Sequence, residues 1–236
     1  LYVTKADVKE VKKVSNTTEK VRTNIRTLTY HTAYKKGTEK CTNFYVCHPI
    51  EQFEEHMKYL YDTHVHTKES SKCGETCAAD IVARYKSLGY DGICITDHIH
   101  TSGFNWLGGA TYDEQVENWL KGYRTAKAFE DENFTVILGM ELRFKENDND
   151  YLVFGFDEDF LHSMDLANIE TLEDFAPIAK KNNLVVIQAH PFREGMTVKN
   201  PDLVDGFEVY NGHGGHDSRN PIARAWAERF SKLMTS

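Results

Sequence analysis

The pair His64 and His66, at the end of an apolar segment, is the feature that most constrains the fold of this chain. The segment covers residues 59–61 and leads through Asp62 into the two histidines. Residues i and i+2 of an extended strand point to the same side, so both imidazoles can face one point, as a metal site requires. A His-x-His pair also occurs by chance, and it becomes informative only when other strands end in the same way.

Other apolar runs of the chain also end in residue types that bind metals. These runs and their last residues are 92–96 with Asp97 and His98, 134–140 with Glu141, and 184–189 with His190. Residues 151–156 and 206–210 are two more predicted strands. Continuous apolar runs, most of them separated by a helical pattern, are typical of a parallel sheet covered on both faces. In a barrel of such strands the active site forms at the carboxyl ends, so this clustering favours a functional site over a purely structural role.

Helical patterns follow most of the strands. Thr76 is predicted to cap one helix, and Thr111 with Glu114 predicts a capping box at the start of a second. Two further helices are predicted, one over residues 168–181 and one with Asn220 as its N-cap. Strands that alternate with helices place the chain in the α/β class.

Composition narrows the possible functions. With 236 residues, 40% of them hydrophobic, the chain can build one substantial core. Its net charge of −8 disfavours a partner such as long nucleic acid, which proteins grip through its phosphates. The five cysteines form neither a disulfide framework nor a C-x2-C zinc spacing, so we expect reduced thiols and a cytoplasmic protein. No apolar run reaches the length of a membrane span, so we expect no membrane partner.

The beginning of the chain differs from the rest. Residues 1–56 open with a polar and charged stretch and lack the strand-end pattern described above. We expect an N-terminal extension of unknown role over residues 1–56 and the functional domain over residues 57–236.

Four motifs carry a resemblance to a known family. They are Asp62-Thr63-His64-Val65-His66-Thr67, Ile95-Thr96-Asp97-His98, Gly139-Met140-Glu141 and Ala189-His190-Pro191-Phe192-Arg193. In this order and spacing they resemble the successive motifs of the PHP superfamily, the polymerase and histidinol phosphatase domains, over about residues 58–236. Segments 66–74 and 208–211 look like the small metal-dependent phosphoesterase branch of that superfamily.

The resemblance implies a distorted (β/α)7 barrel that holds two or three divalent metal ions, which activate water to hydrolyse a phosphoester. The residues that match the metal ligands are His64 and His66 for the first metal, His190 and Asp150 for the second, His98 and Glu69 for the third, and Glu141 as a bridge between the first two. Imidazole and carboxylate ligands suit Zn²⁺, Mn²⁺ or Fe²⁺.

Basic and polar residues near these motifs are candidates for substrate binding. Arg193 could hold a phosphate with its planar guanidinium, although an ordinary surface charge explains this residue equally well. Arg143 and Asn211 are two more candidates for the same task. Arg193 also stands, with Asp97 and His98, among the catalytic candidates.

The chain departs from the family pattern at its end. The last family motif, an Asp-x-His after the final helix, would begin where residues 234–236 stand. We expect either that the natural chain continues past Ser236, with this motif on a last barrel strand, or that the metal site is incomplete. His213 and His216 could replace the missing ligands, but solvent-facing histidines in a glycine-rich loop are the simpler explanation.

These observations predict a metal-dependent hydrolase that cleaves a phosphoester of a small metabolite or nucleotide. A PHP domain without catalysis, acting as a structural or regulatory module, is the alternative from a different class. A nuclease acting on long DNA is a weaker third hypothesis, because the sequence has no basic stripe.

Overall fold

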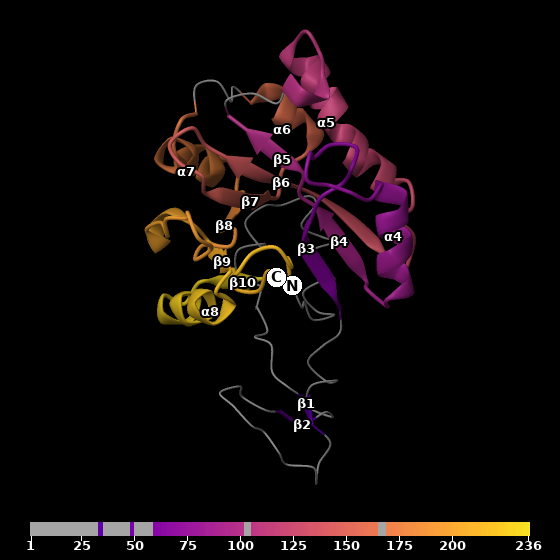
Figure 1. Cartoon of the computed structure of the whole chain (residues 1–236). Helices are drawn as coiled ribbons and strands as arrows, with labels where there is room; N and C mark the ends of the chain where they lie inside the picture. The colour runs from indigo at the N-terminus through magenta and orange to yellow at the C-terminus, as the bar shows by residue number, and fades with distance from the viewer. Residues whose placement is uncertain (1–32, 35–47, 50–58, 102–104, 165–168) are drawn as a thin grey trace. The chain divides into compact units, whose positions relative to one another are not determined.

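The chain divides into two units, Leu1–Leu60 and Tyr61–Ser236, and Figure 1 labels the helices and strands described in them. The computed structural model describes residues 33–34, 48–49, 59–101, 105–164 and 169–236. In the first unit it describes the strands β1 (Ala33–Tyr34) and β2 (His48–Pro49), which pair in parallel. The candidate functional residues belong to the second unit.

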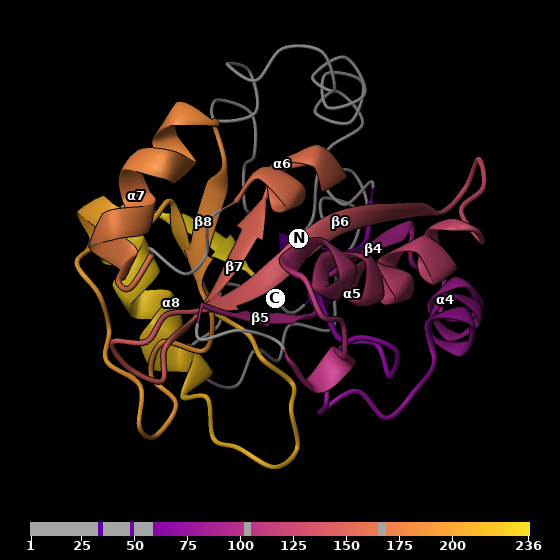
Figure 2. The ribbon, with the colours of Figure 1, turned by 90° about the horizontal axis from the view of Figure 1, so that it is seen from above.

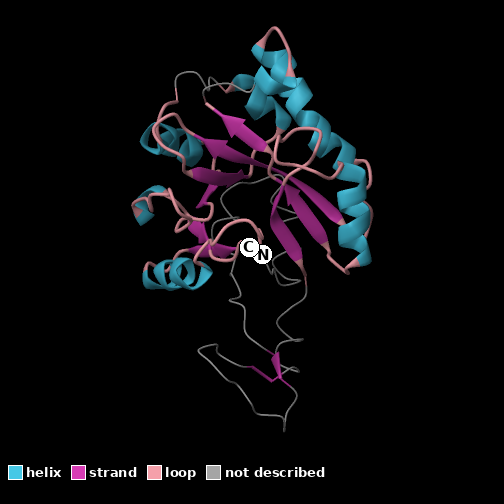
Figure 3. Cartoon of the chain, in the orientation of Figure 1, coloured by secondary structure: helices cyan, strands magenta, loops and turns pink. Residues whose placement is uncertain are grey.

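The second unit is built on one sheet of eight strands (Figure 3). The strands are β3 (Tyr61–Val65), β4 (Gly92–Ile95), β5 (His98–His100), β6 (Thr135–Arg143), β7 (Asp150–Phe154), β8 (Val185–Gln188), β9 (Gly206–Glu208) and β10 (Leu233–Thr235). Their order is β10-β9-β8-β7-β6-β4-β3, and β5 pairs with β6 beside this path.

The sheet curls until its two edges meet. The backbone N–H and the hydroxyl of Thr63 in β3 both donate to the carbonyl of Ser236, which follows β10, at 3.1 and 2.6 Å. The helices lie around the outside of this curled sheet (Figure 2). The expected α/β architecture with a distorted, barrel-like sheet is therefore confirmed, and β10 provides a strand after the last helix.

The direction of β7 differs from the predicted parallel sheet. This strand runs antiparallel to both of its neighbours, β6 and β8, whereas every other pairing in the sheet is parallel. The cause is the short link of residues 144–149, because a parallel crossover needs about a dozen residues or more. The hairpin brings Asp150, the first residue of β7, opposite Arg143 at the end of β6.

Among the residues of this unit that the structure describes, five helices and two short 3-10 turns accompany the sheet. They are α4 (Ala78–Ser87), η1 (Asn105–Leu107), α5 (Tyr112–Lys127), α6 (Glu158–Ser163), α7 (Leu172–Lys181), η3 (Pro201–Leu203) and α8 (Asn220–Arg229). The predicted capping box of Thr111 and Glu114 is confirmed at the start of α5. Two predicted caps were wrong by one residue, because Cys77 precedes α4 and Arg219 precedes α8. Helix α6 was not predicted.

Among the described residues, the buried hydrophobic side chains form two clusters. The larger cluster includes Trp119, Tyr151 and Phe175, and the smaller one includes Ile93 and Phe134 under α4. Within the described part of the chain, no helix has the length and apolar character needed to cross a membrane. The two clusters hold the strands rigidly, so the polar strand ends keep fixed positions relative to one another.

Candidate metal centre

Glu141 lies at the centre of a ring of histidines. One carboxylate oxygen, Oε1, is 3.2 Å from Nε2 of His64 and 3.1 Å from Nε2 of His190. The other oxygen, Oε2, is 3.3 Å from Nε2 of His66 and 2.9 Å from Nδ1 of His98. The Glu141 side chain is only 1% exposed. Four of the histidines predicted from strand ends therefore converge on the carboxylate that was predicted as the bridge.

The local backbone explains this convergence. Thr63 and Val65 of β3 are buried on one side, so His64 and His66 share the other, as their spacing predicts. Strand β5, which was not predicted, pairs with β6 so that His98 stands directly opposite Glu141. The ligand geometry therefore depends on the register between β5 and β6, in which the paired residues His98 and Glu141 are 43 positions apart in the sequence.

His190 adopts an unusual backbone conformation. Its φ angle is +29°, and the strain of a left-handed non-glycine residue persists only where surrounding contacts enforce it. Its backbone N–H donates to Oε2 of Glu208 at 2.7 Å, and its side chain is 4% exposed. The turn after β8 is thus held in the conformation that points the imidazole at Glu141.

Glu208, at the end of β9, supports two of the histidines and was missed as a site residue. Its Oε1 is 2.8 Å from Nδ1 of His64, and the amide of Asn211 donates to both of its oxygens at 3.2 and 3.3 Å. A carboxylate that binds the far nitrogen of a metal-binding histidine fixes the tautomer and orientation of the ring. The sequence signal was weak, because Glu208 stands inside the predicted strand 206–210, whereas β9 ends at Glu208 in the structure.

Asp150 links the histidines to two arginines. Its carboxylate accepts two hydrogen bonds of 2.7 Å each from Arg143, and its Oδ2 lies 3.5 Å from Nη2 of Arg193. The same oxygen is 3.7 Å from Nε2 of His190. The reversed direction of β7 makes this possible, since it sets Asp150 at the edge where the parallel strands end.

Asp97, between β4 and β5, binds the loop that follows β3. It accepts hydrogen bonds of 2.7 Å from the backbone N–H and the hydroxyl of Thr67, and another of 2.7 Å from the hydroxyl of Ser71. Gly122 of α5 permits this packing, because a Cβ there would lie 2.1 Å from the Thr67 hydroxyl. With its side chain buried and both oxygens engaged, Asp97 is placed to shape the loop.

The structure does not bring Glu69 into the ring. Both of its carboxylate oxygens lie 3.1 Å from the backbone N–H of Ala78, the first residue of α4. Glu69 therefore caps this helix, which has no cap from Cys77. Cys73, from the same loop, instead approaches His66 and His98, and the possible ligand atoms of these three residues lie within 4.8 Å of one another.

The charges of the ring balance one another. Burial lowers the pKa of His98, but Glu141 and Cys73 together outweigh burial and the pKa rises to about 10. The pKa of His64 is also raised, because Glu141 and Glu208 outweigh the effect of burial. Burial raises the pKa of Glu141, yet the charges of His64 and His98 hold it well below its usual range. Without cations, protons on the imidazoles thus compensate the buried carboxylates.

Several polar atoms of the ring lack a well-aligned hydrogen bond within the described residues. Nδ1 of His190 has no partner in this part of the chain, and Nδ1 of His98 and Oε2 of Glu141, although 2.9 Å apart, do not have the geometry of a hydrogen bond. Buried polar atoms normally have a partner, so atoms of this kind in a ring of ligand types are the sign of a binding site for cations. Two further groups of ligand atoms within 4.8 Å support this interpretation, namely His64 with Glu141 and His190, and His98 with Glu141 and Asp150.

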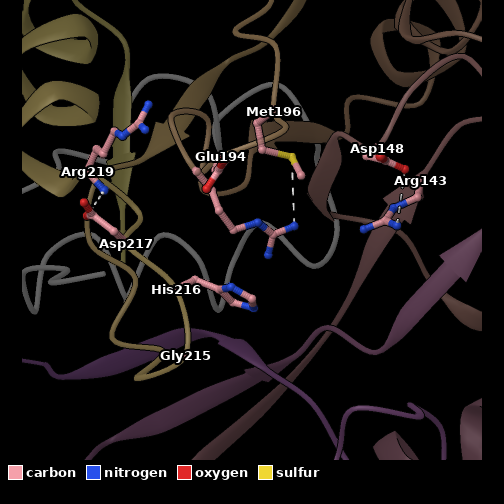
Figure 4. A pocket seen from close by; sticks show the side chains of 9 residues that line it. Arg143, Asp148, Glu194, Met196, Gly215, His216, Asp217 and Arg219 are labelled. Carbon is pink, nitrogen blue, oxygen red and sulfur yellow. Dashed lines mark hydrogen bonds and ion pairs between the residues drawn. The ribbon is translucent and has the colours of Figure 1, made fainter.

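A cavity of about 650 Å³ is lined in part by Arg143 and Arg193, the two arginines that contact Asp150 (Figure 4). Three arginines contribute to its lining, and His216 lies among them. The complete lining is Arg143, Asp148, Arg193, Glu194, Met196, Gly215, His216, Asp217 and Arg219. His213 stacks on His216 with ring centroids 4.8 Å apart, and both side chains are exposed. Two of the predicted substrate-binding residues, Arg143 and Arg193, therefore share one cavity, whereas Asn211 contacts Glu208.

Comparison with solved structures supports the fold. PsfC from Pseudomonas syringae PB-5123 matches with a TM-score of 0.52 and 20% identity, over 75% of each chain. A two-domain protein from Bacteroides vulgatus, which contains a predicted PHP-like metal-dependent phosphoesterase, matches with a TM-score of 0.50 and 19% identity, over 75% of this chain and 50% of that one. At these identities the likeness concerns the fold alone. No curated protein sequence matches the chain.

The family model described as the PHP domain matches residues 62–231. This range contains all the histidines of the ring, Glu141, Asp150 and Glu208. It also covers the curled sheet from β3 to the last helix. The match spans well over half of the chain, and the expected fold type is confirmed by it and by the architecture. The chain belongs to the PHP domain family.

Proposed function

We propose that this protein is a metal-dependent hydrolase that cleaves a phosphoester of a small metabolite or nucleotide. The observation that carries the proposal is the ring of four histidines around Glu141, which is linked through Asp150 to Arg143 and Arg193 in the lining of a cavity. Cation ligands and anion-binding groups are thus adjacent, as hydrolysis of a phosphate ester requires.

The residues of the chain divide into three tasks. Those that would hold two or three divalent cations, Zn²⁺, Mn²⁺ or Fe²⁺, are His64, His66, His98, Glu141, Asp150 and His190. Bound cations would supply an activated water and neutralise charge that develops on the phosphate. Glu208 keeps His64 oriented, and Arg193 with Arg143 would bind the phosphate oxygens through their planar guanidinium groups.

The cavity favours a small substrate. Its volume of about 650 Å³ lies within the range of small-molecule sites, roughly 300–1,000 Å³. Three acidic residues, Asp148, Glu194 and Asp217, alternate with the arginines in its lining, which would repel a long polyanion. The net charge of −8 would also repel a long polyanion. We propose a cytoplasmic location for this activity.

Removal and return of metal test the proposal. We expect the chain stripped by a chelator to release no phosphate from a panel of sugar phosphates, nucleotides and aryl phosphates. Reloading with Zn²⁺, Mn²⁺ or Fe²⁺ should restore phosphate release with at least one substrate class. Tight binding of metal without hydrolysis of any panel member would contradict the proposal and support the non-catalytic module instead.

Arg193→Ala is expected to weaken substrate binding while leaving the metal content unchanged. Loss of a charged hydrogen bond costs roughly 1.5–3 kcal/mol, so KM should rise by about 10- to 100-fold. Steady-state kinetics on an accepted phosphoester, together with metal analysis, measure both effects. Arg84→Ala, an exposed arginine on α4, is the matched control and should change neither quantity. Parallel loss of metal and activity in the Arg193 variant would instead show that it acts through Asp150.

A further inference from the structure

We propose that Cys73, His66 and His98 form a thiolate-containing cation subsite at the rim of the ring. This subsite rests on the proposed function, because His66 and His98 also face Glu141 in the ring. It deepens that function by adding a thiolate ligand. A thiolate would make this subsite chemically different from the others, which offer only imidazole and carboxylate ligands. The cluster would then hold one cation bound in part by a soft thiolate ligand, beside cations bound only by imidazole and carboxylate ligands.

The rings of the two histidines are arranged for a common ligand target. Their centroids are 4.5 Å apart and their planes differ by 15°, so the two rings are stacked and nearly parallel. The possible ligand atoms of His66, His98 and Cys73 all lie within 4.8 Å of one another. Metal–nitrogen bonds of about 2.0–2.1 Å and a metal–sulfur bond of about 2.3 Å require ligand atoms no more than about 4.4 Å apart, so small shifts of the side chains suffice to surround one ion.

The loop that carries Cys73 is held on both sides. Ser71 is tied to Asp97, and its hydroxyl also accepts a hydrogen bond of 3.0 Å from the backbone N–H of His98. After Cys73, the N–H of Gly74 donates to the carbonyl of Ser71 at 3.1 Å. A Cβ on Gly74 would lie 2.3 Å from the carbonyl oxygen of Thr67, so the loop folds tightly back on itself here. The thiol is therefore presented by a fixed turn.

His98 is equally well anchored. The indole N–H of Trp119, a buried residue of α5, donates to the carbonyl of His98 at 2.9 Å. The pairing of β5 with β6 fixes the strand on its other side. Two of the three ligands thus come from rigid surroundings, which lowers the entropic cost of capturing a cation.

The position of Glu69 explains why a cysteine matters here. The resemblance assigned this loop carboxylate to a third metal, but its oxygens are engaged by Ala78 at the start of α4. Cys73 is the loop residue that faces the two histidines instead. Thiolate ligands favour Zn²⁺ and Fe²⁺ over Mn²⁺ and Mg²⁺, which prefer oxygen. We therefore expect the subsite to select a thiophilic ion.

Cobalt spectroscopy of the full chain tests the subsite independently of activity. Co²⁺ replaces Zn²⁺ in many sites, and a thiolate bound to it gives an intense charge-transfer absorption band in the near ultraviolet. We expect this band in the Co²⁺-loaded protein and its loss in Cys73→Ser, together with about one metal equivalent per chain. Cys77→Ser, in the same loop, is the matched control and should keep both.

A variant with four cysteine substitutions tests whether Cys73 alone is enough to give the charge-transfer band. Cys41→Ser, Cys47→Ser, Cys77→Ser and Cys94→Ala are combined so that only Cys73 remains. The band should persist in this variant, and if the variant fails to fold, the single substitutions still identify the ligand. A band that survives Cys73→Ser, or Co²⁺ binding to the unchanged protein without any such band, would overturn the proposal.

Phosphate release measured on the same samples separates the two proposals. Hydrolysis without the thiolate band would overturn the subsite and leave the proposed function intact. The band without hydrolysis of any phosphoester would overturn the proposed function and leave the subsite intact. Each failure therefore has its own signature.

Discussion

Replacing Glu141 by glutamine is expected to remove most of the divalent metal from the protein. The carboxylate contacts four histidines from both of its oxygens, and a neutral amide cannot bridge two cations or offset their charge. Loss of an outer partner of a metal ligand costs roughly 10- to 100-fold in metal affinity, so loss of this bridge should exceed about 100-fold. Mass spectrometry of metal content, after dialysis against a fixed free-metal concentration, measures the change.

Two other glutamates provide a graded control. Glu208→Gln should lower metal affinity by roughly 10- to 100-fold, because Glu208 orients His64 without facing the shared centre. Glu69→Gln should leave the affinity unchanged, because that carboxylate lies at the start of α4. Equal metal content in all three variants would show that the ring is an ion-pair network and not a metal centre.

Asp97→Ala is expected to destabilise the fold by about 2–4 kcal/mol. The substitution would leave three buried donors, two from Thr67 and one from Ser71, without their acceptor. Burial raises the pKa of Asp97, so removing the carboxylate also relieves a desolvation cost, and the net loss is smaller than three full hydrogen bonds. The melting temperature should fall by roughly 5–15 °C for a unit of this size.

Two variants show whether this effect comes from the hydrogen bonds. Asp97→Asn keeps the shape but turns one amide N–H₂ toward a donor, so its loss should be intermediate. Asp159→Ala removes an exposed carboxylate of α6 and should stay within about 0.5 kcal/mol of the unchanged protein. A melting temperature for Asp97→Ala equal to that of Asp159→Ala would mean that the loop after β3 does not depend on Asp97.

The features of the fold that could be predicted were those encoded by neighbouring residues. The capping box of Thr111 and Glu114 lies within one turn of chain, and it is present as predicted. The direction of β7 depends on the length of the link before it, and its apolar pattern is the same for either direction. Strand β5 has only three residues with a histidine at each end, so no periodicity marks it. Pairing with β6 alone makes it a strand.

In the candidate site, too, the features set by neighbouring residues were predicted, and those set by long-range packing were not. Spacing along β3 was enough to place His64 and His66 on one face, because alternation is a property of any strand. The loop from Thr67 to Cys73 has no such rule. Glu69 was the predicted ligand in this loop and Cys73 was not a candidate, and which one turns inward depends on the start of α4 and on the hydrogen bonds to Asp97. Chain packing, and not residue type, decided between them.

The closure of the sheet at Thr63 and Ser236 bears on how the molecule folds and opens. Their contact joins residues 173 positions apart, so it closes a longer loop than any pairing of neighbouring strands in the sheet. The loss of chain entropy on closing such a loop slows its formation, and the seam should assemble after the hairpin of β6 and β7. It should also open first, and the amide of Thr63 should exchange with solvent sooner than those of the central strand β6. His64 follows Thr63 directly, so each opening would loosen the strand that carries the first two histidines and give cations a route of exchange between solvent and the ring.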